Sequence, residues 1–246
     1  MINEIWEDIR FFTGRLKSLK ISESLDVDGG FCVYTGCKYE NWVYYPKRVK
    51  SSETVSKILK FFSERDATFM WPVYDDGEEY LKNSGLIYAG DLRAMSFDTK
   101  NSAPKPRPDI KIKISPSTSP EIWAETADYA FGGNPEETPE SYINFVRSLK
   151  NDADNLSLYT AELEGKTAGT FMITNEPELT GVYYFAVIPE MRRRGVANAM
   201  MNEICRLSKG KKIVLQSTPS GFKFYSAFGF NDLFGIHVYS TEGDIL

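Results

Sequence analysis

The sequence predicts an α/β fold of the mixed, α+β kind, in which a mostly antiparallel sheet is flanked by helices and a smaller α/β domain comes first. Three observations support this prediction. Helical and strand-like apolar patterns alternate along the 246 residues without a strict βαβ repeat. Glu164-Gly165-Lys166 joins two strand-like runs as a hairpin turn would. The segment Lys100–Pro108 (KNSAPKPRP) is rich in proline and separates two parts of the chain.

We therefore expect a first α/β domain over 1–100, a linker over 101–108 and a second domain over 109–246. The first domain begins with an amphipathic helix, because apolar residues recur at helical spacing from Ile2 to Leu16. A second helix has Ser51 or Ser52 as its N-cap and an apolar stripe from Val55 to Phe62. Short apolar runs and turn residues predict the remaining elements: strands at 31–35, 42–45 and 68–73, a short helix at 78–84, and a strand at 86–97.

The second domain begins with a strand at 110–114, which two helices at 120–131 and 139–150 follow. The hairpin strands lie at 156–163 and 167–174, and a strand rich in Tyr, Phe and Val spans 181–187. A helix over 195–208 has one apolar face. The last elements are a short buried strand at 213–216, a short helix at 221–228 and a strand at 235–240.

Composition excludes several classes of function. Three cysteines and one histidine offer neither a disulfide framework nor a zinc site, so we expect no metal. The net charge of −5 argues against a general nucleic-acid binder. No window is apolar for long enough to span a membrane, and the N-terminus resembles neither a secretory signal nor a transit peptide. We therefore expect a cytoplasmic protein without a membrane partner.

One local exception to the acidic composition carries most of the functional argument. The strand that ends at Val187 is followed by Pro189, three consecutive arginines and Gly195, and then by a helix. A glycine turn at a helix N-terminus offers free N–H groups and the positive end of the helix dipole. Such a site suits a phosphate, and Arg192, Arg193 and Arg194 add positive charge beside it. The segment therefore predicts a pyrophosphate or nucleotide phosphate site.

The residues of this segment resemble a known family. Val187-x-Pro189-x-x-Arg192-x-x-Gly195-x-Ala197 is similar to the coenzyme A pyrophosphate motif of the GNAT N-acetyltransferases. Some thirty residues later, FYSAFGF over 224–230 resembles the second signature of the family, a tyrosine four residues before Gly-Phe. The resemblance covers about 110–240. Thr218 and Gly221 stand where the family often has Asn and Ala.

The resemblance implies an acetyl-CoA-dependent N-acetyltransferase in which the acceptor amine attacks the thioester directly. It implies that the strand end aligns the pantetheine arm, that a backbone N–H near Val187 polarises the thioester carbonyl, and that backbone N–H groups of 192–197 hold the pyrophosphate. Tyr225 would protonate the departing thiolate, and Thr218 would offer a hydroxyl in place of the Asn amide. The implied cofactor-binding residues are Phe185, Ala186, Val187, Arg192, Arg193, Arg194, Gly195, Val196, Ala197, Thr218 and Tyr225.

The acceptor is a small-molecule or peptide amine that the sequence does not name, and the oligomeric state is open. Four carboxylates are candidates for the acceptor pocket or the general base: Glu136, Glu137, Glu176 and Glu178. An alternative function is a non-catalytic acyl-CoA-binding sensor or interaction module. A further one is a nucleic-acid or phosphoprotein binder that uses the basic cluster.

The first hundred residues echo the second domain. Tyr44-Tyr45-Pro46 resembles Val187-Ile188-Pro189, and the segment 80–86 resembles 224–230. The residues needed for the chemistry are replaced, because Val49, Ser52 and Leu81 stand where Arg192, Gly195 and Tyr225 would be. We interpret 1–100 as a degenerate acetyltransferase-like domain without a cofactor site, the alternative being an unrelated accessory α/β domain.

Overall fold

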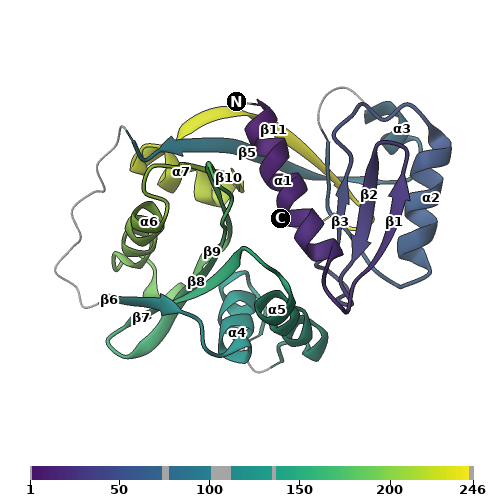
Figure 1. Ribbon diagram of the computed structural model, residues 1–246. Coiled ribbons are helices and arrows are strands. Elements are labelled where there is room, and N and C mark those ends of the chain that lie inside the picture. The colour runs from purple at the N-terminus through teal and green to yellow at the C-terminus, as the bar shows by residue number, and fades with distance from the viewer. Residues whose placement is uncertain (1, 74–77, 101–111, 135–136, 244–246) are drawn as a thin grey trace. The chain divides into compact units, whose positions relative to one another are not determined.

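The computed structural model describes residues 2–73, 78–100, 112–134 and 137–243 (Figure 1). The chain divides into two compact units. The first comprises 1–94, 216–223 and 232–246, and the second comprises 95–215 and 224–231. The predicted linker, 101–108, lies outside the described residues. The division differs from the expected one because two C-terminal segments group with the N-terminal residues.

The first unit contains a three-stranded antiparallel sheet with the strand order β1-β2-β3. Helices α1 and α2 cover opposite faces of this sheet (Figure 1). Ser51 is the N-cap of α2, as its position predicts, and its hydroxyl accepts a hydrogen bond from the Thr54 N–H (3.4 Å). The bounds of these elements are α1 (Ile2–Lys17), β1 (Glu23–Val27), β2 (Gly30–Tyr34), β3 (Trp42–Tyr44) and α2 (Ser52–Ser63).

The rest of the first unit is built around a strand from the far end of the sequence. Strand β11 (Asn231–Ser240) pairs antiparallel with β4 (Trp71–Val73), in a register that places His237 opposite Val73. On its other side β11 neighbours β5 (Ile87–Asp98), and α3 (Glu78–Lys82) precedes β5 in the chain. This pairing places the strand that we expected in the second domain within the first unit.

The second unit contains the strand order β10-β9-β8-β7-β6. Strands β6 to β9 are antiparallel, whereas β10 runs parallel to β9. The expected mixed, mostly antiparallel sheet flanked by helices is therefore confirmed. The elements are β6 (Ile112–Pro116), α4 (Pro120–Ala130), α5 (Glu140–Asp152), β7 (Leu156–Leu163), β8 (Lys166–Thr174), β9 (Leu179–Val187), η1 (Pro189–Met191), α6 (Val196–Leu207), β10 (Lys212–Ser217) and α7 (Pro219–Phe228). The end of β10 and the start of α7, residues 216–223, group with the first unit.

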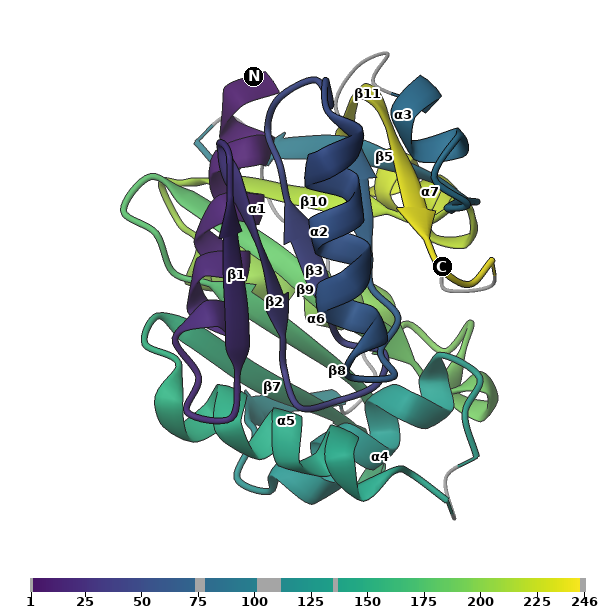
Figure 2. The same cartoon turned by 90° about the vertical axis from the view of Figure 1, so that its right-hand side faces the viewer.

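Helices on both faces of this sheet form the core of the second unit. Helices α4 and α5 pack against each other and against β7 and β8, and α6 lies across the other face (Figures 1 and 2). The largest side chains between these layers, among them Trp123, Phe145 and Phe171, are fully buried. Because burial of a large apolar side chain contributes about 1.5–3 kcal/mol, this core fixes the strand that leads to the predicted phosphate site.

The two units share an order of elements. In the first, helix α1 precedes three antiparallel strands, and α2, β4, α3 and β5 follow. In the second, α4 and α5 precede β7, β8 and β9, and α6, β10 and α7 follow, whereas the next strand of the chain, β11, groups with the first unit. Strand β10 is parallel to β9, and Trp42 forms a parallel bridge to Met70, next to β4. The common order is the pattern that an internal repeat produces.

Candidate cofactor site

The predicted phosphate site is the turn that joins β9 to α6. Gly195 is the N-cap of α6 and has a left-handed backbone (φ 83°), which glycine adopts at no steric cost. No side chain caps this helix, and its first turn contains no acidic residue. Its first hydrogen bond runs from the Ala199 N–H to the Gly195 oxygen (3.0 Å), so the N–H groups of residues 196–198 have no acceptor within the helix.

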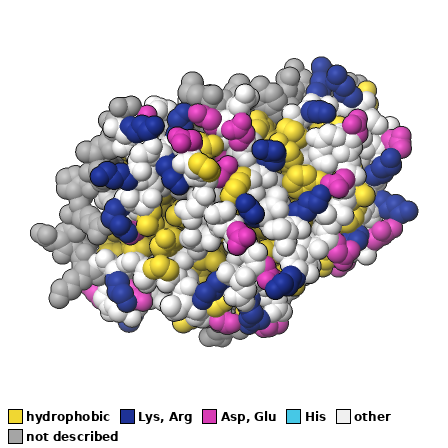
Figure 3. Space-filling view, in the orientation of Figure 1, with side chains coloured by type: hydrophobic (Ala, Val, Ile, Leu, Met, Phe, Trp, Pro, Cys, Tyr) yellow, Lys and Arg dark blue, Asp and Glu magenta, His cyan; other side chains and the backbone are white. Residues whose placement is uncertain are grey.

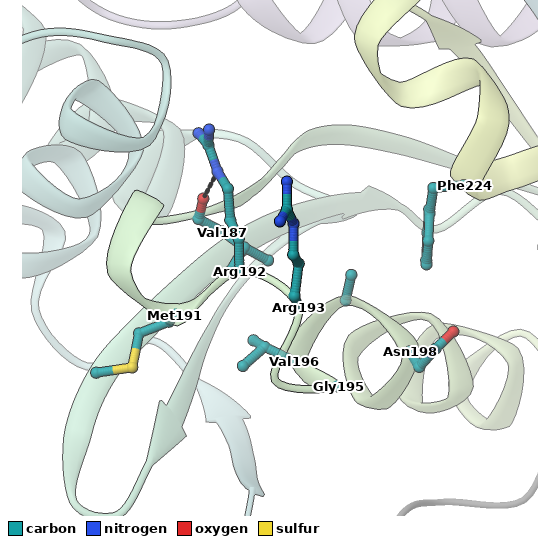
Figure 4. Close-up of a pocket in the computed structure, with 9 residues that line it drawn as sticks. Val187, Met191, Arg192, Arg193, Gly195, Val196, Asn198 and Phe224 are labelled. Carbon is teal, nitrogen blue, oxygen red and sulfur yellow. Dashed lines mark hydrogen bonds between the residues drawn. The ribbon is translucent and has the colours of Figure 1, made fainter.

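A pocket of about 300 Å³ opens at this helix N-terminus (Figure 4). Six of the residues that line it belong to the predicted set: Val187, Arg192, Arg193, Gly195, Val196 and Ala197. Met191, Asn198 and Phe224 also line it, although the sequence did not predict a role for them. Asn198 lies one helical turn after Gly195, and this spacing is the signal that could have identified it.

The strand that leads into the pocket is distorted. Two residues of β9, Tyr184 and Phe185, lie opposite one residue of β8, and Tyr184 has a positive φ of 50°. Such a bulge bends the strand and re-aims the residues that follow it. Strand β10 pairs with residues 179–182 of β9, so among the described residues of the second unit the end of β9 pairs with β8 alone. Phe185, Ala186 and Val187 therefore lie on a bent strand end beside the pocket.

The three arginines differ in what their side chains contact. Arg194 donates to the Glu164 carboxylate (2.9 Å) and to the Met191 sulfur (3.2 Å) and does not line the pocket. The Arg192 guanidinium donates to two backbone oxygens, one of which belongs to Val187 (Figure 4). Arg193 is exposed on the pocket wall and has a left-handed backbone (φ 61°), which is uncommon for a residue other than glycine.

Tyr225 lies in α7 within a group of aromatic rings. Its ring centroid is 5.8 Å from that of Phe185 and 5.5 Å from that of Phe230. Its neighbour Phe224 stacks on Phe185 (5.7 Å) and lines the pocket, whereas Tyr225 itself does not. The side chain is buried, and burial raises the pKa of Tyr225 above its usual value. The phenol is therefore protonated at neutral pH, as a proton donor must be.

The remaining candidates lie elsewhere. Thr218 belongs to the first unit, where its hydroxyl bonds with that of Ser220 (2.9 Å). Glu176 and Glu178 precede β9, whereas the pocket is at its far end, roughly 26 Å away at about 3.3 Å per residue. Glu137 is exposed and does not line the pocket, and Glu136 lies outside the described residues. The structure thus brings none of the described candidate carboxylates to the pocket wall.

Charges on the visible face in Figure 3 are interspersed, with acidic side chains next to basic ones and no continuous basic stripe. Within the described part of the chain, no three His, Cys, Asp or Glu side chains gather as metal ligands would. The described helices include none with the length and apolar character needed to cross a membrane. The turn between β9 and α6, the predicted phosphate site, is thus the feature from which a function is best inferred.

Comparison with known proteins identifies the domain that contains this turn. The family model of the acetyltransferase (GNAT) domain matches residues 154–232, which include β9, the turn, α6 and α7. Residues 154–232 are therefore similar to the GNAT acetyltransferase family. Over 86 residues the chain is 36% identical to an acetyltransferase of Photorhabdus laumondii, a match that covers 35% of this chain and 54% of that protein. The chain thus spans about half the length of this curated relative.

Solved structures of the GNAT family share the fold over nearly the whole chain. A GCN5-related N-acetyltransferase from Kribbella flavida is 11% identical with a TM-score of 0.66, covering 96% of this chain and 94% of that one. A tandem GNAT protein from the clavulanic acid biosynthesis pathway is 12% identical with a TM-score of 0.60, covering 94% and 86%. At these identities the likeness supports the fold alone, and it agrees with a GNAT-like sheet flanked by helices.

Proposed function

We propose that the protein is an N-acetyltransferase that transfers the acetyl group of acetyl-CoA directly to an amine. The observation that carries the proposal is the uncapped N-terminus of α6, which opens into a pocket beside the bent end of β9. The N–H groups of residues 196–198 and the helix dipole attract the pyrophosphate. Gly195 has no side chain to obstruct the approach of the phosphates, and the exposed Arg193 side chain adds positive charge.

The end of β9 supplies the other half of the site. Residues 185–187 align the pantetheine arm by backbone hydrogen bonds, and a backbone N–H near Val187 stabilises the oxyanion that develops on the thioester carbonyl. The acceptor nitrogen forms a bond to the acetyl carbon as the bond from carbon to sulfur breaks. The amine loses a proton to solvent, and the departing thiolate takes one from Tyr225, whose burial keeps its phenol protonated and which regains a proton from solvent after the transfer. Orientation of the two substrates supplies much of the remaining rate enhancement.

The first unit, in this proposal, is a degenerate acetyltransferase-like domain without a cofactor site. Val49 and Leu81, which stand where Arg192 and Tyr225 would be, are fully buried in the apolar core of this unit. The aliphatic side chains of Val and Leu carry neither a charge nor a donor group, so they cannot bind a phosphate or donate a proton. The shared order of elements in the two units supports an origin by duplication.

Binding and turnover test the proposal separately. Acetyl-CoA stabilises the folded protein by about 2.7 kcal/mol at one hundred times its dissociation constant, whereas free acetate does not. Release of free thiol with a panel of small-molecule and peptide amines then distinguishes a transferase from a non-catalytic acyl-CoA sensor, which binds without turnover. The absence of any thermal shift at millimolar acetyl-CoA would refute the cofactor assignment.

A further inference from the structure

Two side chains of the turn that follows β9 contact the C-terminal end of α4. The carboxylate of Glu190 accepts a hydrogen bond from the Tyr129 hydroxyl. The Arg192 guanidinium donates from Nη2 to the Ala130 oxygen (3.0 Å) and from Nε to the Val187 oxygen (3.0 Å). Tyr129 and Ala130 are the last two residues of α4, and Val187 is the last residue of β9. We call these contacts the α4 clasp.

Helix α4 lacks a cation of its own at this end. The last carbonyls of a helix have no N–H donor within the helix, and the negative end of the dipole lies there. The last turn of α4 contains no basic residue, so Arg192, 62 positions further along the chain, supplies both the donor and the charge. Hydrogen bonds from a charged donor are stronger than those between neutral groups, so these two bonds hold the turn against the helix.

The clasp gives Arg192 and Arg193 different environments. The Arg192 guanidinium is directed to two carbonyl oxygens on two elements, a task that its planar fork of donors performs and a lysine ammonium does not. The Arg193 side chain, by contrast, makes no hydrogen bond or ion pair with the residues that the structure describes, and it lines the pocket beside Gly195 (Figure 4). A guanidinium in that position is available to a phosphate.

We infer that Arg192 is a positioning residue, which together with Glu190 and Tyr129 holds the cofactor turn in place, and that Arg193 is the arginine that contacts the phosphates. This inference rests on the proposed function for its binding readout. The α4 clasp fixes the turn between two points, the end of β9 and the end of α4, and so fixes the direction of the N–H groups at the start of α6. Cofactor affinity then depends on Tyr129 and Glu190, although neither lines the pocket.

Matched substitutions separate positioning from charge. Arg192→Met and Arg192→Lys both weaken acetyl-CoA binding roughly tenfold, the equivalent of about 1.4 kcal/mol, because neither rebuilds the fork. Arg193→Met weakens binding as well, but Arg193→Lys keeps most of the affinity because it keeps a charge for the phosphates. Tyr129→Phe combined with Arg192→Met costs less than the sum of the two single effects, whereas Tyr129→Phe combined with Arg193→Met is additive.

Hydrogen exchange of the protein without ligand tests the clasp independently of the function. Arg192→Met and Tyr129→Phe speed exchange of the amides at the end of α4, and Arg193→Met leaves it unchanged. If acetyl-CoA does not bind the wild type, the proposed function fails while this exchange pattern still reports on the clasp. Wild-type affinity in Arg192→Lys, full additivity of Tyr129→Phe with Arg192→Met, or unchanged exchange at the end of α4 in Arg192→Met would overturn the inference.

Discussion

A Cβ placed on Gly169 would lie 2.5 Å from the backbone oxygen of Ala186. In the register of β8 and β9, Gly169 pairs with Val187, and Ala186 is the next residue of β9, which pairs with Thr170. No side chain fits at position 169, because the atom that its Cβ would meet is a backbone oxygen rather than the end of a flexible side chain. Gly169 therefore lets the end of β9 lie close to β8, at the point where the turn between β9 and α6 begins.

Gly169→Ala is expected to destabilise the protein and to weaken acetyl-CoA binding. The added methyl group forces the end of β9 away from β8, and overpacking of this kind costs roughly 1–3 kcal/mol. Urea unfolding measures the loss, and calorimetry measures the affinity. Gly14→Ala is the control, because Gly14 lies within α1 with no atom within 4 Å of the new Cβ. Equal stability of the two variants would show that β9 can relax without cost.

Gly195→Glu is expected to abolish acetyl-CoA binding while leaving the protein folded. The new side chain occupies the space of the pyrophosphate, and its charge repels the phosphates. Gly210→Glu is a matched control, since Gly210 has the same φ of 83° as Gly195 and lies outside the pocket. Both variants carry similar backbone strain, so a loss of affinity confined to Gly195→Glu reports on the ligand site. Retained binding in Gly195→Glu would place the phosphates elsewhere.

The sequence predicted most elements because apolar periodicity follows burial. The stripe from Val55 to Phe62 became the buried face of α2, and the turn at Gly195 was recognised from local residues alone. Strand β1 (Glu23–Val27) was missed because most of its residues are exposed or half-buried, which leaves no apolar pattern to detect. Strand β11 was predicted as a strand, but its partner β4 lies more than 150 positions away, and no local signal records such a pairing.

Contacts between residues far apart in the sequence also limit what the sequence predicts about the site. The turn between β9 and α6 depends on neighbouring residues, so Pro189, Arg193 and Gly195 were sufficient to predict where it lies. The contact between Arg192 and Ala130 joins residues 62 positions apart, and only the fold reveals it. Phe224 was overlooked because its place in the pocket wall depends on how α7 packs against Phe185.

Tyr225→Phe is expected to lower kcat far more than it lowers acetyl-CoA affinity. The ring keeps its packing against Phe185 and Phe230, and only the proton donor is lost. A general acid contributes roughly 10²–10⁴ in rate, and its loss depresses kcat and kcat/KM together. An unchanged kcat with the best acceptor would mean that the thiolate leaves without help from Tyr225.

The Tyr225 phenol is also expected to ionise only at strongly alkaline pH. Because burial raises its pKa in the folded protein, any stability it adds is complete below the ordinary tyrosine pKa of about 10 and is lost as pH rises toward the folded value. Burial also raises the pKa of Tyr44, Tyr45 and Tyr159, and the hydrogen bond to Glu190 raises that of Tyr129, but the shift of Tyr225 is the largest of these. Ultraviolet absorbance should therefore show a final phase, at the highest pH, that belongs to Tyr225. Tyr225→Phe should remove that late phase, and its persistence in the variant would assign it to another ring.

The ion pair between Arg147 and Glu121 should give the wild type an acid-dependent advantage over Arg147→Met. The Arg147 Nη2 donates to the Glu121 carboxylate at 2.8 Å and links α5 to the start of α4. This hydrogen bond, together with smaller contributions from the Glu121 N–H and the Ser119 hydroxyl, lowers the pKa of Glu121 to about 2. The stabilisation is therefore present above about pH 4.5 and is lost as pH falls toward 2. Melting temperatures of both proteins against pH measure it, and in a Glu121→Gln background the pH dependence of the difference should vanish.

Each chain is expected to bind one acetyl-CoA, because the first unit lacks the residues that a cofactor site needs. Val49 and Leu81 fill the core where a phosphate ligand and a proton donor would have to stand. Ser52 begins α2 where the second unit has Gly195, and the α2 N-terminus is already capped by the Ser51 hydroxyl, which accepts the N–H that a phosphate would need. The N-terminus of α6 has no such cap. Calorimetric titration should therefore give one site per chain, which Gly195→Glu removes entirely. Two sites per chain, one of which survives Gly195→Glu, would instead make both units cofactor-binding domains.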